Sequence, residues 1–196
     1  MASTTVGSVR CWSTIGTKER PLVFAVDAST WDRCDAECSP ERGFHYSASK
    51  HSAGQPIVAG WSYQWICQLN WAPHSSTAPL DALRIAPSMD GPATTIEQVR
   101  RLVDLLPAGA DVPLFVFDAG YDGIALGHGL SGTRAQVLVR ISASRVFHPD
   151  PPLRETRTPG RPRRHGARFE LSSEATWTTP DAELVTDVAR YGKVHV

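Results

Sequence analysis

Two short apolar runs, each closed by an aspartate, constrain the fold of this chain more than any other feature of its sequence. The first is PLVFAVD at 21–27, and the second is VPLFVFD at 112–118. Continuous apolar runs of this length predict strands that are buried on both faces. Functional side chains in open α/β sheets gather outside the carboxyl ends of the strands. If the two strands are neighbours, Asp27 and Asp118 therefore meet at one edge of the sheet.

Two neighbouring carboxylates have two common chemical uses. They hold Mg²⁺ through hard oxygen ligands, or they divide acid and base roles between them. The structural alternative is that Asp27 and Asp118 only form the turns that end their strands. The residues alone leave both interpretations open.

The rest of the first 145 residues alternates strand and helix patterns. Strands are expected at 44–49, 57–69 and 135–141, and helices at 94–106 and 121–130. Thr94 and Glu97 form a capping-box pattern at the start of the first helix. The preceding segment 71–93 contains four prolines and is expected to be a loop. Together with the two apolar runs, this order predicts an α/β layer architecture.

The long strand expected at 57–69 places its aromatic side chains on one face. Trp61, Tyr63 and Trp65 share that face because side chains alternate along a strand. We expect Trp61, Trp65 and Trp71 to be core and sheet-face residues rather than a platform on which bases stack.

Charge is distributed unevenly along the chain. The 196 residues contain 20 Lys and Arg against 20 Asp and Glu, so the formal net charge is zero. The segment 145–168 nevertheless carries seven arginines against two acids, together with five prolines. An exposed arm of this kind suits a nucleic-acid backbone, because arginine pairs with phosphate through a planar fork of donors. The alternative is a solvated, proline-rich linker with no partner.

Composition and motifs exclude several classes of protein. A hydrophobic content of 41% is enough to build a core, and no apolar run is long enough to span a membrane as a helix. The polar segment 1–20 lacks the apolar region of a secretory signal. Four cysteines are too few for a disulfide scaffold, so a reducing cytosol is expected. Dinucleotide-binding, P-loop and serine-hydrolase motifs are absent from the sequence.

Three stretches of the chain resemble a known family. LVFAVDAST, KHSAGQPIVAGWSYQWICQL and PLFVFDAGYD are similar to the DDE transposases of bacterial insertion sequences, over roughly residues 20–145. The resemblance implies an α/β, RNase H-like fold with a mixed sheet and flanking helices. It implies an irregular lead-in at 1–20, a partial catalytic core at 21–145 and the Arg/Pro-rich start of an inserted β region at 146–196.

The resemblance also assigns roles to the two aspartates. Asp27 would be the first catalytic acid and Asp118 the second, and both would be metal ligands. Two Mg²⁺ or Mn²⁺ ions about 3.5–4 Å apart would activate water and then a freed 3′-hydroxyl for attack on a phosphodiester. Asp27 would bridge both ions, while Asp118 and a glutamate would each hold one.

The third acid of that family, a glutamate on a later helix, has no counterpart here. Glu155, Glu170, Glu174 and Glu183 come too early, in loop-like or insertion-like sequence. We therefore expect a transposase fragment that shows no Mg²⁺-dependent strand cleavage by itself. The alternative is a non-catalytic DNA-binding remnant that acts through its arginines.

The resemblance further implies where the protein acts and what it binds. Its partners would be the DNA of transposon ends and target, and the intact enzyme would form a homo-oligomer in the bacterial cytoplasm beside the nucleoid. The arginines expected to contact DNA are Arg157, Arg161, Arg163, Arg164 and Arg168.

Three weaker patterns in the sequence do not establish a further functional site. Cys34, Cys38, His45 and His51 are zinc-ligand types, but their spacing matches no familiar finger and the resemblance explains the histidine region without metal. The Asp27 segment resembles that of an aspartyl phosphatase, but Ser29 stands where such enzymes place a second aspartate. Three polar side chains of the stretch KHSAGQPIVAGWSYQWICQL either lie beside the active site or DNA or have a structural role. They are Lys50, His51 and Gln55.

Overall fold

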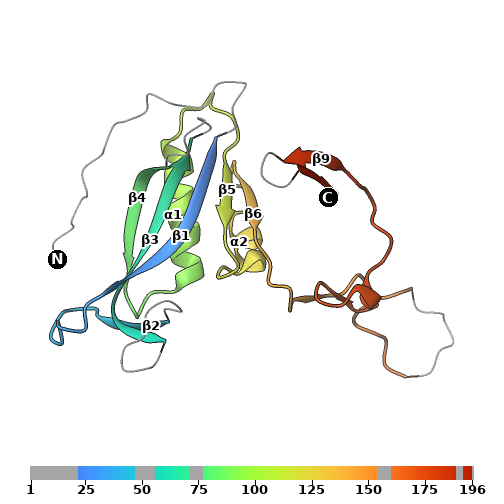
Figure 1. Ribbon diagram of the computed structural model, residues 1–196, viewed down its shortest axis with the longest axis horizontal. Coiled ribbons are helices and arrows are strands. Elements are labelled where there is room, and N and C mark those ends of the chain that lie inside the picture. The colour runs from blue at the N-terminus through green and yellow to red at the C-terminus, as the bar shows by residue number, and fades with distance from the viewer. Residues whose placement is uncertain (1–21, 47–55, 71–76, 154–159, 189–191, 196) are drawn as a thin grey trace. The chain divides into compact units, whose positions relative to one another are not determined.

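The computed structural model describes residues 22–46, 56–70, 77–153, 160–188 and 192–195 (Figure 1). The chain divides into two compact units, Met1–Arg140 and Ile141–Val196. Each unit is described by itself. Among the described residues, no helix is long and apolar enough to cross a membrane.

The first unit is built on a mixed six-stranded sheet. Its strands are β1 (Val23–Asp32), β2 (Gly43–Tyr46), β3 (Ile57–Leu69), β4 (Thr77–Ile85), β5 (Leu114–Phe117) and β6 (Gln136–Val139). β3 pairs antiparallel with β1, β2 and β4, whereas β5 pairs parallel with both β1 and β6. β1 is therefore a central strand, as its continuous apolar sequence predicts.

Two helices, α1 (Gly91–Leu105) and α2 (Gly123–Gly129), pack on one face of this sheet. Figure 1 shows α1 running along β1, β3 and β4. The buried core joins Phe24 and Val26 of β1, Ile66 of β3 and the phenylalanines of β5 to Val99, Leu102, Val103 and Leu126 of the helices. The rings of Phe24 and Phe115 stack with their centroids 5.1 Å apart, at the centre of the sheet.

The expected loop at 71–93 was wrong over its middle part, because β4 occupies Thr77–Ile85. Pro79 concealed this strand in the sequence. It lies opposite Cys67, and the register between β3 and β4 shifts next to this pair. A proline is tolerated in a strand at such an irregularity, and at a position on the edge of a sheet.

The capping box expected at Thr94 and Glu97 was also wrong. Asp90 is the N-cap of α1, and its Oδ1 accepts a hydrogen bond from the backbone N–H of Ala93 at 2.8 Å. Pro92 lies in the first turn, where its missing N–H is not needed. Thr94 is thus inside the helix, and its hydroxyl donates to the Asp90 carbonyl at 2.6 Å.

The second unit contains short strands and little buried surface. β7 (Val146–Phe147) pairs with β8 (Phe169–Glu170), and β9 (Val185–Val188) pairs with β10 (Gly192–His195), both antiparallel. A 3₁₀ turn, η1 (Glu174–Thr176), follows β8. None of the side chains described in this unit is buried. The assignment of 146–196 to an inserted region stays a prediction.

Candidate active site

Asp27 and Asp118 follow neighbouring positions on two parallel strands. Val26 of β1 lies beside Phe117 of β5, so the next residue of each strand is an aspartate. The structure brings the two predicted site residues together, and both line one pocket of about 380 Å³. One detail differs from the expectation, because β1 does not end at Asp27. It continues to Asp32, paired antiparallel with β3 beyond the point where β5 stops.

Each carboxylate keeps one oxygen for a ligand. The Asp27 Oδ1 accepts from the backbone N–H of Ala28, and the Asp118 Oδ1 accepts from that of Gly120, both at 2.8 Å. No hydrogen bond joins either Oδ2 to another described residue, and both side chains are exposed. A Cβ at position 120 would lie 3.0 Å from the Asp118 Oδ1, so glycine allows this close turn.

This pair of oxygens fits a hard divalent cation. Carboxylate oxygens are the ligands that Mg²⁺ and Mn²⁺ prefer, and Mg²⁺ is commonly held by one or two carboxylates together with water and substrate phosphate. Within the described ranges, no group of three or more Asp, Glu, His or Cys side chains comes together. Asp27 and Asp118 are thus a pair of carboxylates, without a third such side chain beside them among the described residues.

A buried polar network lies beside the aspartate pair. Gln64 of β3 and Gln98 of α1 are 3% and 1% exposed, and the Gln64 Nε2 donates to the Gln98 Oε1 at 2.7 Å. The Gln64 Oε1 accepts from the hydroxyl of Thr95 at 2.9 Å and lies 3.5 Å from that of Tyr121. The network ties β3, α1 and the turn after β5 together beneath the site.

Tyr121 is the aromatic wall of the pocket. Its ring meets Phe117 edge-on, with centroids 5.1 Å apart. Burial raises the pKa of the Tyr121 phenol well above its ordinary value, and the negative charges of Asp27 and Asp118 raise it further. The hydroxyl therefore stays protonated at neutral pH and can donate a hydrogen bond into the site.

Gln64 and Tyr121 were not predicted as site residues from the sequence. The available signal for Tyr121 was its place three residues after Asp118, in the stretch PLFVFDAGYD. For Gln64, the signal was a polar residue on the face of β3 opposite the aromatic side chains. Neither pattern in the sequence indicates which residues these two side chains contact in the folded core.

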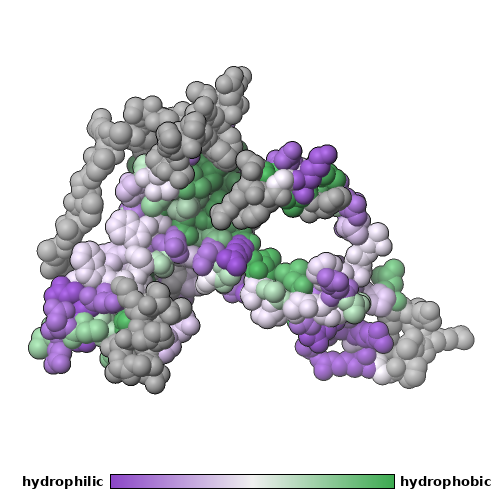
Figure 2. Space-filling model, in the orientation of Figure 1, coloured by the Kyte–Doolittle hydropathy of each residue, from purple (hydrophilic) through white to green (hydrophobic). Residues whose placement is uncertain are grey.

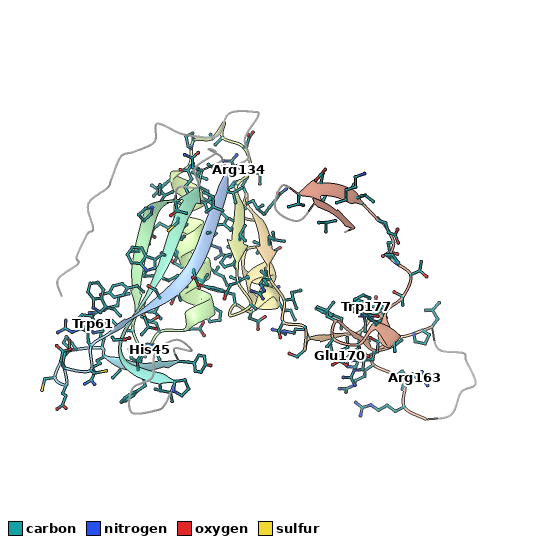
Figure 3. The ribbon with its side chains drawn as sticks, in the orientation of Figure 1. His45, Trp61, Arg134, Arg163, Glu170 and Trp177 are labelled. Atoms are coloured by element: carbon teal, nitrogen blue, oxygen red, sulfur yellow. The ribbon has the colours of Figure 1, made fainter. Side chains whose placement is uncertain are left out.

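The tryptophans of β3 lie on the sheet face that α1 leaves uncovered. Trp65 is 36% exposed and its Nε1 donates to the Ser29 hydroxyl at 2.8 Å. The guanidinium groups of Arg33 and Arg84 lie 5.3 Å and 5.6 Å from the ring centre of Trp61. Trp61 is labelled in Figure 3. Trp61 and Trp65 are sheet-face residues but not core, because the other face of β3 packs on α1. Trp71 lies outside the described residues.

The zinc-ligand types do not gather in the part of the chain that the structure describes. Cys34 and Cys38 are exposed, while His45 lies on β2 and is half-buried. His51 lies outside the described residues, as do Lys50 and Gln55.

The arginine segment of the second unit is exposed. Arg161, Arg163 and Arg164 form no ion pair with another described residue. Arg168 binds Glu170 instead, with its guanidinium 2.7 Å from the Oε2, and the Ser172 hydroxyl donates to the other oxygen. Figure 2 shows strongly hydrophilic side chains gathered around this part of the unit. Arg157 lies outside the described residues.

A mixed sheet with an antiparallel β4–β3–β1 half, a parallel β1–β5–β6 half and helices on one face is an α/β, RNase H-like fold. The family described as DDE superfamily endonuclease matches residues 12–194, and the chain belongs to this family. No curated protein matches the chain. Among solved structures, the chain is similar to the PFV RNase H domain, a solution structure, with 11% identity over 62% of this chain and 78% of that one, and a TM-score of 0.30.

Proposed function

We propose that this chain supplies Asp27 and Asp118, two of the carboxylates of a transposase site that cleaves and joins DNA phosphodiesters with bound Mg²⁺ or Mn²⁺. The observation that carries the proposal is the side-by-side placement of these two aspartates, each with an oxygen available to a ligand. Membership of a DDE endonuclease family supports it. Transposon ends and target DNA as partners, a homo-oligomeric intact enzyme and a place in the bacterial cytoplasm beside the nucleoid are parts of the same proposal.

The residues of the site have separable roles in this chemistry. When bound, the divalent ions neutralise phosphate charge and lower the pKa of the attacking water or hydroxyl. Asp27 and Asp118 would hold them through their Oδ2 atoms. The hydrogen bonds from Ala28 and Gly120 orient the two carboxylates, and Tyr121 offers a neutral donor beside them.

The test of the proposal is a titration of the purified chain with Mn²⁺, followed by electron paramagnetic resonance. We expect binding that Asp27→Asn and Asp118→Asn each weaken at least about tenfold, because each removes one of two charged ligands. Asp111→Asn, at an exposed position outside the pocket, is the matched control and should bind as the unmodified chain does. Equal affinity in all four proteins contradicts the proposal.

Two carboxylates are too few to hold two dications well, so we expect no Mg²⁺-dependent strand cleavage by this chain alone. Among the described glutamates of the second unit, the Glu170 carboxylate is already bonded by Arg168 and Ser172. Incubation with labelled plasmid and oligonucleotide DNA tests this expectation. Cleavage that Asp27→Ala abolishes would contradict it.

A second candidate function is DNA binding through the arginine segment without catalysis. Arg161, Arg163 and Arg164 favour it, because they are exposed and have no ion pair among the described residues. Replacing all three by alanine should weaken DNA binding and reduce the slope of log affinity against log salt by about 0.9 for each phosphate that is no longer neutralised. Asp27→Ala should leave this binding unchanged.

The control for that experiment removes the same charge from the first unit. Arg33, Arg101 and Arg140 are replaced together by alanine, and the salt slope should change less than in the segment variant. An equal change in both triple variants would mean that net charge, rather than the segment, sets the affinity. Filter binding of duplex DNA at several salt concentrations measures both.

A further inference from the structure

The pocket beside the aspartate pair extends well beyond the two carboxylates. Its volume of about 380 Å³ is that of a site for a small organic group. Gly91, Pro92 and Thr95, from the first turns of α1, line it together with Asp27 and Asp118. A group bound there therefore lies directly next to the acids.

The walls of the pocket suit a flat, unsaturated ring. Ile85 at the end of β4 and Pro92 of α1 contribute apolar surface, and the almost fully buried Leu126 of α2 also lines the pocket. The Tyr121 ring adds an aromatic wall that its edge-on contact with Phe117 fixes in place. Apolar and aromatic walls of this kind hold a nucleobase by its faces when it has left the base stack.

A few polar groups interrupt these walls. The Ser62 hydroxyl lines the pocket and forms no hydrogen bond with another described residue. The Tyr121 hydroxyl lies 3.5 Å from the Gln64 Oε1, which is long enough for it to turn to a better acceptor. Donors and acceptors in such small number orient a ligand without deciding its affinity.

We propose that this pocket binds one unpaired nucleobase of the DNA strand whose phosphodiester lies at Asp27 and Asp118. The inference rests on the proposed function, because a nucleobase is one sugar away from its own phosphate. The pocket then selects DNA that is distorted or frayed at the reacting position, since extruding a paired base costs free energy.

The experiment compares two kinds of DNA duplex, which differ in one group. Each carries a single extra, unpaired nucleotide. In the first kind, this unpaired nucleotide bears each of the four bases in turn. In the second kind, it is abasic. Without divalent metal, we expect the best base to bind the chain at least about fivefold more tightly than the abasic duplex, the lower end of base–aromatic stacking. Equal affinity for the abasic duplex and all four bases overturns the inference.

Filling the pocket should remove that preference. A Cβ at Gly91 would meet no atom within 4 Å, so Gly91→Trp can place its ring in the pocket without a backbone clash. The control is Gly109→Trp, which also has open space at its Cβ and lies outside the pocket. We expect Gly91→Trp to bind the duplex with the best base and the abasic duplex equally tightly. Gly109→Trp should keep the preference for the base.

A second filling variant, Ser62→Phe, covers the case in which Gly91→Trp does not fold. A preference that persists in folded protein of either filling variant overturns the inference. The result is independent of the metal titration. Mn²⁺ binding that does not depend on Asp27 or Asp118 would contradict the proposed function. Absence of a base preference in the unmodified chain would contradict only the nucleobase pocket.

Discussion

Gln64 shows how a single buried side chain can hold together the elements around the aspartate pair. Its amide oxygen accepts from Thr95 and its amide nitrogen donates to Gln98, all within the interface between β3 and α1. Buried polar groups are nearly always hydrogen-bonded, because an unpaired one costs free energy. Removing the Gln64 amide would therefore leave the Gln98 amide oxygen without its donor. The Gln98 Nε2 already lacks a partner in this network.

Replacing Gln64 by leucine should therefore destabilise the chain. We expect a loss of about 1–3 kcal/mol in the free energy of unfolding, because Gln98 would be left with neither end of its amide paired. Tyr121→Phe removes only the long 3.5 Å contact to Gln64 and should cost less than about 1 kcal/mol at neutral pH. Urea unfolding followed by circular dichroism measures both, and an equal loss in the two variants would contradict the prediction.

Tyr121 should also give the chain a pH dependence of its own. Its pKa is raised above the ordinary value of 10.0, first by burial and then by Asp27 and Asp118. The folded chain thus holds the phenol proton more tightly than the unfolded chain. The stabilisation is complete below about pH 10 and is lost as the pH rises through the folded-state pKa.

The comparison that isolates this effect is Tyr121→Phe. Between about pH 8 and about pH 11, the urea midpoint of the unmodified chain should fall further than that of the variant. Other tyrosines and lysines titrate in both proteins, so their contribution cancels in the difference. A variant that falls as steeply as the unmodified chain would contradict the assignment.

At this scale, the sequence predicted the acids but not their surroundings. Asp27 and Asp118 each close an apolar run, which is a local pattern that a reader of the sequence can see. The Gln64–Gln98 pair joins residues on a strand and a helix that only meet in the folded core. No local signal indicates such a partner.

At the scale of elements, α1 is the clearest case of a correct helix with a wrong start. The spacing of Val99, Leu102 and Val103 predicted the buried face, since apolar residues at helical spacing face the core. The start depends on which of several polar residues reaches the first free N–H groups. Asp90 does, and Glu97 is exposed in the second turn.

Asp90→Ala should for that reason destabilise the chain by about 0.5–2 kcal/mol, the usual effect of losing an N-cap. Glu97→Ala should change the free energy of unfolding by no more than about 0.5 kcal/mol. Thermal or urea unfolding of the two variants checks the difference. A larger effect at Glu97 than at Asp90 would support the capping box that the sequence suggested.

β4 illustrates the opposite error, an element that the sequence concealed. A proline inside a run argues against a central strand, and that rule is sound for strands paired on both sides. β4 pairs with β3 at a shifted register and has no second partner among the described strands. Whether a strand lies at an edge is a property of the whole sheet and is not written in its own residues.

At the scale of the molecule, the two units differ in how they are held together. Met1–Arg140 has a continuous core between sheet and helices, whereas no described side chain of Ile141–Val196 is buried. Regions with few buried apolar contacts open at low free energy. The second unit should therefore be the first to lose its structure.

Limited digestion with trypsin tests this difference. We expect cleavage after Arg145 and within 161–168 before cleavage after Arg100 or Arg101, although these two are also exposed. The peptide bonds after Arg100 and Arg101 are protected by the hydrogen bonds of α1. Mass spectrometry of early time points identifies the cuts, and early cleavage within α1 would show that the two units are equally labile.

The topology of the sheet also predicts the order in which its strands pair during folding. β3 pairs with β1 and β4 through shorter connections along the chain than the one that separates β1 from β5, where Val23 pairs with Leu114. Contacts between residues far apart in sequence close the largest loops and form slowly. Asp27 and Asp118 reach neighbouring positions only after that pairing, so the proposed metal site would form only once β1 and β5 have paired. The Mn²⁺ binding expected of the proposed site would then report that the pairing of β1 with β5 is complete.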